Sequence, residues 1–144
     1  MRMEFTYPPN YDDIVAAFDI KGRHGIVFTY GNVLHNPSRV HVSPDLYAHE
    51  ETHVRQQAAF QGENPGGEAL PCGARGWWER YIADAAFRLD QEVEAYRAQW
   101  AYAKDNMYGR KARRELLAHI TKALSGPMYG RIVTAAQAKE LISG

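Results

Sequence analysis

Hydrophobic and polar residues follow two different periods along the chain, and the change of period separates a short sheet from several helices. Residues 25–30 are mainly β-branched or aromatic, Gly31-Asn32 has the composition of a two-residue hairpin loop, and Val33 resumes the apolar pattern. Residues 39–42 alternate polar and apolar side chains, as a half-buried strand does. The pattern therefore predicts a small antiparallel meander over residues 25–42.

Helical periodicity follows the meander. Ser43-Pro44-Asp45 has the composition of a helix start, with a capping serine, a proline at the first position and an acid in the first turn. Gly62 and the turn residues after it mark the end, so we expect a helix within residues 43–62. Within residues 77–107, apolar residues three and four apart form one stripe on a second long helix. The stripe consists of Leu89, Val93, Tyr96, Trp100, Ala103 and Met107.

The two ends of the chain carry shorter helical patterns. Residues 10–22 contain a capped N-terminal helix, and residues 110–144 contain two more, the last with a capping box that begins at Thr134. Asp84 is the predicted cap of the long helix that carries the stripe. We find no repeat and no linker, so the sequence predicts one α+β domain over residues 1–144. Its sheet is antiparallel, has about three strands and packs on a mainly helical body.

Composition excludes several classes of function. The chain has 144 residues, 17 basic and 17 acidic side chains, and a formal net charge of zero, so it lacks the field expected of a nucleic-acid-binding protein. A single cysteine, Cys72, rules out an internal disulfide. No signal peptide or transmembrane run is recognisable, so the expected location is the cytoplasm or a phage particle.

The pattern H-E-x-x-H over residues 49–53 carries the strongest chemical signal. Residues four apart share one helix face, so His49 and His53 would present two imidazoles to one point, with Glu50 beside them. This arrangement is typical of a zinc clamp with a carboxylate in reach of a metal-activated water. Glu50 would then act as general base while the water attacks a carbonyl carbon. The pattern predicts metal-assisted hydrolysis.

A catalytic zinc usually has three protein ligands, so a third one is needed. At about 100° per residue, Glu92 falls roughly 60° from the centre of the apolar stripe and Glu94 roughly 140° away, which favours Glu92 at the edge of the core. The histidines outside the motif are expected in loops or on the surface. The full set of candidates is Glu79, Glu92, Glu94, His24, His35, His41 and His119.

With the H-E-x-x-H segment and Glu92-Val93-Glu94-Ala95-Tyr96 some 40 residues later, the chain resembles the gluzincin zinc metallopeptidases, especially the minigluzincins. In that group a second helix supplies a glutamate within E-x-x-A, which Glu92 and Ala95 fit. The resemblance spans roughly residues 33–100 and implies a zincin-like fold, Zn²⁺ as cofactor, and an extended peptide paired along residues 26–30. Tyr96 departs from the pattern, because many relatives carry there an aspartate that orients a zinc histidine.

The leading hypothesis is a zinc-dependent metallopeptidase of phage or prophage origin, with a peptide or protein as substrate. Its metal ligands would be His49, His53 and Glu92. A tyrosine such as Tyr81, Tyr96 or Tyr102 could stabilise the oxyanion, but the chain has nine tyrosines, which are more often packing residues, and the sequence does not choose among them. The alternative is a non-catalytic structural or assembly protein, for example of a phage particle or a toxin, that retains zinc for folding.

Packing of the predicted helices adds one expectation. Gln57 should point away from the metal. Val54 and Ala58, four residues apart, should pack the H-E-x-x-H helix against the apolar stripe.

Overall fold

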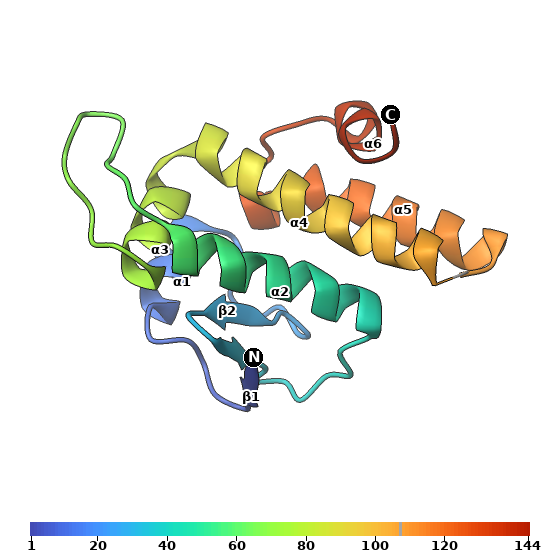
Figure 1. Cartoon of the computed structure of the whole chain (residues 1–144), viewed down its shortest axis with the longest axis horizontal. Coiled ribbons are helices and arrows are strands. Elements are labelled where there is room, and N and C mark those ends of the chain that lie inside the picture. The colour runs from blue at the N-terminus through green and yellow to red at the C-terminus, as the bar shows by residue number, and fades with distance from the viewer. Residues whose placement is uncertain (107) are drawn as a thin grey trace.

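The computed structural model of the chain describes residues 1–106 and 108–144. These residues form six α-helices, one 3₁₀ helix and three short strands, so the chain is an α+β domain as predicted (Figure 1). None of the helices described is long and apolar enough to cross a membrane. In chain order the elements are β1 (Arg2–Glu4), α1 (Tyr11–Ala17), β2 (Phe28–Tyr30), β3 (Val33–His35), α2 (Pro44–Ala59), α3 (Ala74–Ala83), α4 (Ala85–Asp105), α5 (Arg110–Leu124), η1 (Pro127–Tyr129) and α6 (Ala135–Ser143).

The sheet contains the predicted hairpin but a different third strand. Strands β2 and β3 pair antiparallel around Gly31-Asn32, and Gly31 has the positive φ of 61° that such a tight loop favours. The third strand is β1, which pairs parallel to β3 and gives the order β1-β3-β2. The expected antiparallel meander is therefore wrong, because the sheet is mixed and its third strand comes from the N-terminus.

Residues 39–42 fail to form a strand because the chain turns back on itself there. The Asn36 side chain accepts a hydrogen bond from Val40 N at 3.0 Å and donates one to Val40 O at 2.8 Å. Arg39, within this loop, has a left-handed φ of 55°. A ladder hydrogen bond needs extended backbone, which this closed loop does not provide. The alternation of residues 39–42 therefore marks a half-buried loop.

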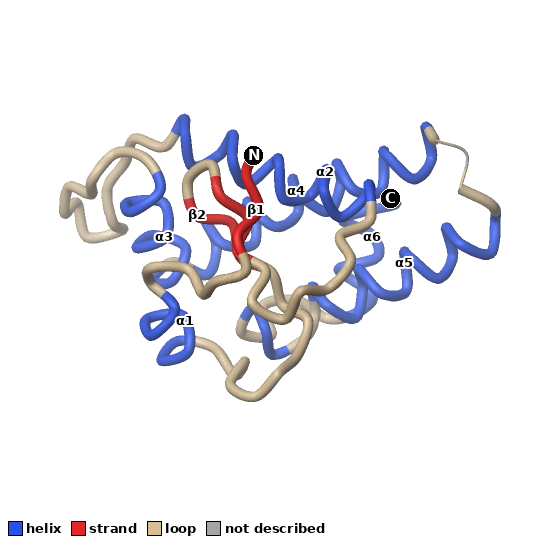
Figure 2. Tube along the Cα trace, turned by 90° about the horizontal axis from the view of Figure 1, so that it is seen from below, coloured by secondary structure: helices blue, strands red, loops and turns tan. Residues whose placement is uncertain are grey.

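The domain is layered around α2. Figure 1 shows α2 lying between the sheet and α4, with α5 and α6 beyond α4. Both views place α1 and α3 together at one end of the sheet, while α5 extends beyond the opposite end (Figure 2). The apolar core includes Trp77, Tyr96, Ile120 and Leu124, all buried. Helix α4 thus has neighbours on two sides.

This sandwiched position buries more of α4 than its apolar stripe predicts. Val93, Tyr96 and Ala103 of the stripe are buried, Leu89 and Trp100 are half-buried, and Met107 lies outside the described residues. The polar side chains buried on the same helix are Arg88, Glu92 and Gln99. Glu92 therefore lies well inside the protein, not at the edge of the core, because α2 covers the polar side of α4.

Several predicted helix ends are confirmed. Asp84 separates α3 from α4 and its side chain accepts hydrogen bonds from Ala86 N and Phe87 N, so it is the N-cap of α4. Thr134 begins α6 in a complete capping box with Gln137. Helix α1 is shorter than its predicted range of 10–22 and ends at Ala17.

The contact between α2 and α4 is more polar than expected. Ala58 is exposed and Val54 only half-buried, so the prediction that these two residues pack α2 on α4 is wrong for Ala58. Gln56 Nε2 instead donates to the Gln91 carbonyl of α4 at 3.0 Å. Gln57 points to the hairpin, where its amide bonds Gly31 N and Thr29 O.

Candidate metal centre

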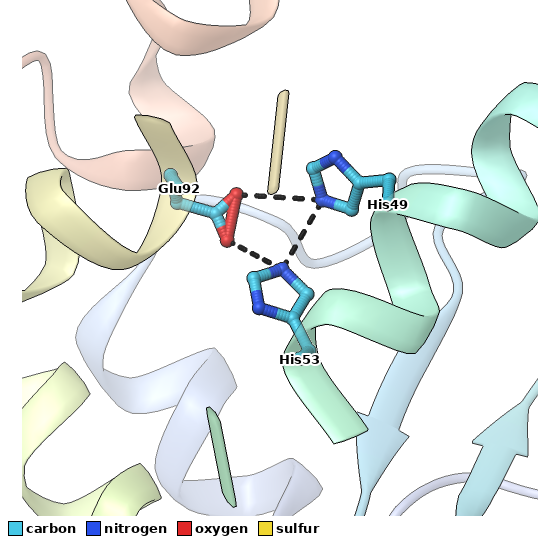
Figure 3. Close-up of side chains that lie close together, drawn as sticks. All are labelled: His49, His53 and Glu92. Carbon is cyan, nitrogen blue, oxygen red and sulfur yellow. Dashed lines mark hydrogen bonds and ion pairs between the residues drawn. The ribbon is translucent and has the colours of Figure 1, made fainter. Parts of the chain in front are cut away.

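His49, His53 and Glu92 meet between α2 and α4 (Figure 3). His53 Nε2 lies 2.9 Å from Glu92 Oε1 and 3.1 Å from His49 Nε2, while His49 Nε2 lies 3.7 Å from Glu92 Oε2. The three side chains belong to residues that are 3%, 6% and 2% exposed. We call this cluster the triad.

The triad can hold a metal ion. With zinc–ligand bonds of about 2.0 to 2.2 Å, tetrahedral coordination places neighbouring donor atoms roughly 3.3 to 3.6 Å apart. The three observed separations, 2.9, 3.1 and 3.7 Å, lie on both sides of this range. Glu92 Oε2 is also buried without a hydrogen-bond partner, which leaves one carboxylate oxygen unsatisfied in the interior. A cation among these atoms would satisfy that oxygen.

The other candidate ligands lie elsewhere. Glu94 is exposed, one residue past Val93 and on the far side of α4 from the triad. Among the described residues, the triad is the only group of three or more histidine, cysteine or acidic side chains close enough to share an ion. His35, expected in a turn, is a buried residue of β3 whose Nδ1 lies 3.0 Å from Thr6 Oγ1. The exposed candidates are Glu79, Glu94, His24, His41 and His119.

Glu50 borders the triad without belonging to it. Its side chain lines the same cavity as His49, His53 and Glu92, and its Oε2 accepts a 2.6 Å hydrogen bond from Thr29 Oγ1 of β2. Burial raises the pKa of Glu50 to about 7, although the nearby His53 and the Thr29 hydroxyl both lower it. The hydrogen bond from the sheet therefore holds in place a carboxyl group that stands beside the ligand set.

The two histidines differ in charge when no metal is present. Burial alone would lower the pKa of His53, but the charge and hydrogen bond of Glu92 outweigh it and raise this pKa to about 9. Burial and the neighbouring His53 charge lower the pKa of His49 to about 3. Gln99 opposes this lowering, although it forms no hydrogen bond of regular geometry with His49 Nδ1. At neutral pH, therefore, His53 is the imidazolium of the triad and His49 is its neutral imidazole.

This charge distribution predicts how the stability of the metal-free protein varies with pH. The pKa of His53 is raised from 6.5 to about 9, so its stabilising contribution is complete below pH 6.5 and is lost as the pH rises through 9. We expect the unfolding free energy in a chelator to fall between pH 7 and 9.5, by up to about 3 kcal/mol. Urea titrations of wild type and a His53→Gln variant measure this. A wild-type stability that is flat or rises over this window contradicts the assignment.

Several contacts of the triad have no sequence signal in the H-E-x-x-H pattern. The Tyr96 ring lies edge-on to His49, with centroids 4.4 Å apart, and its hydroxyl pairs with the Tyr129 hydroxyl at 2.7 Å. Tyr81 OH donates to Glu92 Oε1 at 3.3 Å. Tyr129 comes from η1, which no pattern predicted. Of the three tyrosines considered for the oxyanion, only Tyr81 lines the cavity. Tyr129, which was not considered, lines it too.

The cavity beside the triad is small and covered. Its volume is about 80 Å³, room for a few water molecules and well below the 300 Å³ or more of typical ligand pockets. Ile14 of α1, Phe18 directly after α1 and Met128 of η1 line it as well. On β2, where a peptide substrate was expected to pair, the Thr29 carbonyl is already hydrogen-bonded within the protein. Thr29 O accepts hydrogen bonds from Gln57 Nε2 at 2.8 Å and Trp78 Nε1 at 3.0 Å. A polypeptide substrate would require this cover to move.

The two sequence segments that carry the H-E-x-x-H pattern and Glu92 thus come together in space as one group that could hold a metal ion. Comparison of the chain with known protein families, with characterised proteins and with solved structures found no match.

Proposed function

We propose that the chain is a zinc-dependent hydrolase of peptide bonds, with His49, His53 and Glu92 as the metal ligands and Glu50 as general base. The observation that carries the proposal is the position of Glu50, which lines the cavity beside the triad yet lies outside the ligand set. A purely structural zinc usually has four protein ligands and needs no free carboxylate beside it. The family and a phage origin are part of this proposal and rest on the resemblance alone.

Each residue has a defined task in this reaction. The triad would hold the ion, and zinc when bound supplies Lewis acidity, which polarises a carbonyl and acidifies water. Glu50 takes one proton from a water molecule in the cavity while the water oxygen bonds to the carbonyl carbon. Glu50 then passes this proton to the nitrogen as the carbon–nitrogen bond breaks, while the other water proton stays on the oxygen, which yields a carboxylic acid and an amine. Thr29 holds the Glu50 carboxyl group during both transfers.

The burial of the triad supports a second candidate, in which a zinc ion at the triad serves folding alone. Residues of α1 and η1 cover the site, and the space beside the triad admits water but no peptide. A metal bound between α2 and α4 would then stabilise the contact of these two helices. The two candidates agree on metal binding and differ in whether the cover opens.

Metal analysis followed by a peptide screen separates the candidates. We expect one zinc per chain, and with free zinc at about 100 times Kd a stabilisation of about 2.7 kcal/mol, or roughly 5 to 10 °C in Tm. Cleavage of a diverse peptide library should require zinc and stop on chelation. A chain that binds one zinc but cleaves no peptide supports the structural role, and one that binds no zinc refutes both.

A further inference from the structure

Two buried polar atoms near the triad are left without partners. His49 Nδ1 and Gln99 Oε1 each lie out of solvent and make no hydrogen bond of regular geometry. Gln99 is 4% exposed and lies on α4, on the side that α2 covers. Such atoms are uncommon in native interiors, because an unsatisfied polar group costs free energy. Gln99 lies within hydrogen-bonding reach of His49, where it opposes the lowering of the His49 pKa, so these two unpartnered atoms are the natural donor and acceptor of one bond.

Asp45 determines which end of the Gln99 amide faces His49. Gln99 Nε2 donates to Asp45 Oδ2 at 2.8 Å, and Tyr108 OH donates to Asp45 Oδ1 at 2.9 Å. Burial would raise the pKa of Asp45, but hydrogen bonds from Gln99, Ser43 and Tyr108 outweigh it and lower this pKa, so the group is an ionised acceptor. A carboxylate accepts and does not donate, so the NH₂ end of Gln99 must point to Asp45 and the oxygen must point away from it.

The other histidine of the triad shows the same arrangement. His53 Nδ1 lies 2.8 Å from Gln56 Oε1, while Gln56 Nε2 donates to the Gln91 carbonyl of α4 at 3.0 Å. Gln56 thus extends from α2 and is held by α4, whereas Gln99 extends from α4 and is held by Asp45 of α2. In both cases the amide oxygen is turned to a histidine by an acceptor on the opposite helix.

We propose that Gln99, oriented by Asp45, is the positioning residue of His49. By accepting a hydrogen bond from Nδ1–H, it keeps the proton off Nε2 and turns the Nε2 lone pair towards the triad. Tyr96, whose hydroxyl bonds Tyr129, is not needed for this task. The proposal rests on the proposed metal site. It adds that the neutral amide groups of Gln56 and Gln99 orient the two histidines, and that the ionised carboxylate of Asp45 acts on Gln99 and not directly on a histidine.

Zinc affinity of three variants tests the proposal. Gln99→Met keeps the size of the side chain but removes the acceptor, and we expect zinc Kd to rise about 10- to 100-fold. The double variant Asp45→Asn/Gln99→Glu exchanges amide and carboxylate and keeps an acceptor towards His49, so its Kd should return to the wild-type value or below. Gln91→Met is the control, because the Gln91 side chain is on the same helix as Gln99 and accepts a part-buried hydrogen bond from Trp77 Nε1 of α3, but forms no hydrogen bond with a histidine. A Gln99→Met Kd equal to that of the control overturns the proposal.

Nitrogen NMR of the metal-free protein gives a second, independent readout. Two-bond ¹H–¹⁵N spectra show which nitrogen of His49 carries the proton, and we expect Nδ1 in the wild type and a gain of the Nε2–H form in Gln99→Met. A wild-type His49 protonated on Nε2 refutes the proposal even if no variant folds. If the wild type binds no zinc, the proposed function fails, whereas the His49 tautomer still decides whether Gln99 orients it.

Discussion

Replacing Glu50 with glutamine is expected to lower peptide hydrolysis by about 10²- to 10⁴-fold while leaving zinc content unchanged. The carboxyl group lies outside the triad, so the ligand set remains complete. Glutamine has nearly the same shape, and its carbonyl oxygen can still accept the hydrogen bond from Thr29 Oγ1. The variant loses only the group that takes a proton from water. The kcat measured with a cleavable peptide, together with metal content, gives the result.

Glu51→Gln is a matched control for this variant. Glu51 is the next residue of α2 and is exposed. Its replacement by glutamine makes the same change in formal charge. Its kcat should equal that of the wild type, because the side chain points away from the cavity. Full activity in Glu50→Gln would rule out the general-base role, and loss of zinc from that variant would assign Glu50 to the support of the metal site.

Replacing His53 with alanine should leave no detectable zinc binding at the lowest concentration that saturates the wild type. His53 is one of three donors, and its removal should weaken binding by more than the roughly 10²-fold that loss of an outer partner costs. The variant should also be less stable without metal, by about 3 kcal/mol, because Glu92 would stay buried without its charged partner at 2.9 Å. Calorimetric titration with zinc and thermal unfolding in a chelator measure the two effects.

Two further variants keep this experiment interpretable. His53→Gln/Glu92→Gln removes both charges of the pair, so it should fold better than His53→Ala and still bind no zinc. His119→Ala replaces an exposed histidine of α5 and should bind zinc as the wild type does. Retention of one tightly bound zinc by the double glutamine variant would place the metal away from the triad.

Local pattern was sufficient for the helices that build the site. Pro44 and Asp84 are helix-start signals that act through neighbouring backbone groups. Helices α2 and α4 both begin where these two residues predict. The spacing of four between His49 and His53 defines a shared face in any helix. The choice of Glu92 over Glu94 followed from the same periodicity, and the structure turns Glu92 to the imidazoles.

The tertiary structure decided the features that depend on which elements pack against each other. The apolar stripe marks one buried side of α4, but α2 covers a second, polar side, and this second contact buries Glu92 and Gln99. Likewise, pairing of β1 with β3 joins residues about 31 positions apart, so no local pattern distinguishes β1 from residues 39–42. The sequence by itself determined the donors and the helices that carry them. The tertiary structure supplied Gln99, Asp45, Thr29 and Tyr129, because hydrogen bonds across distant segments depend on packing and not on periodicity.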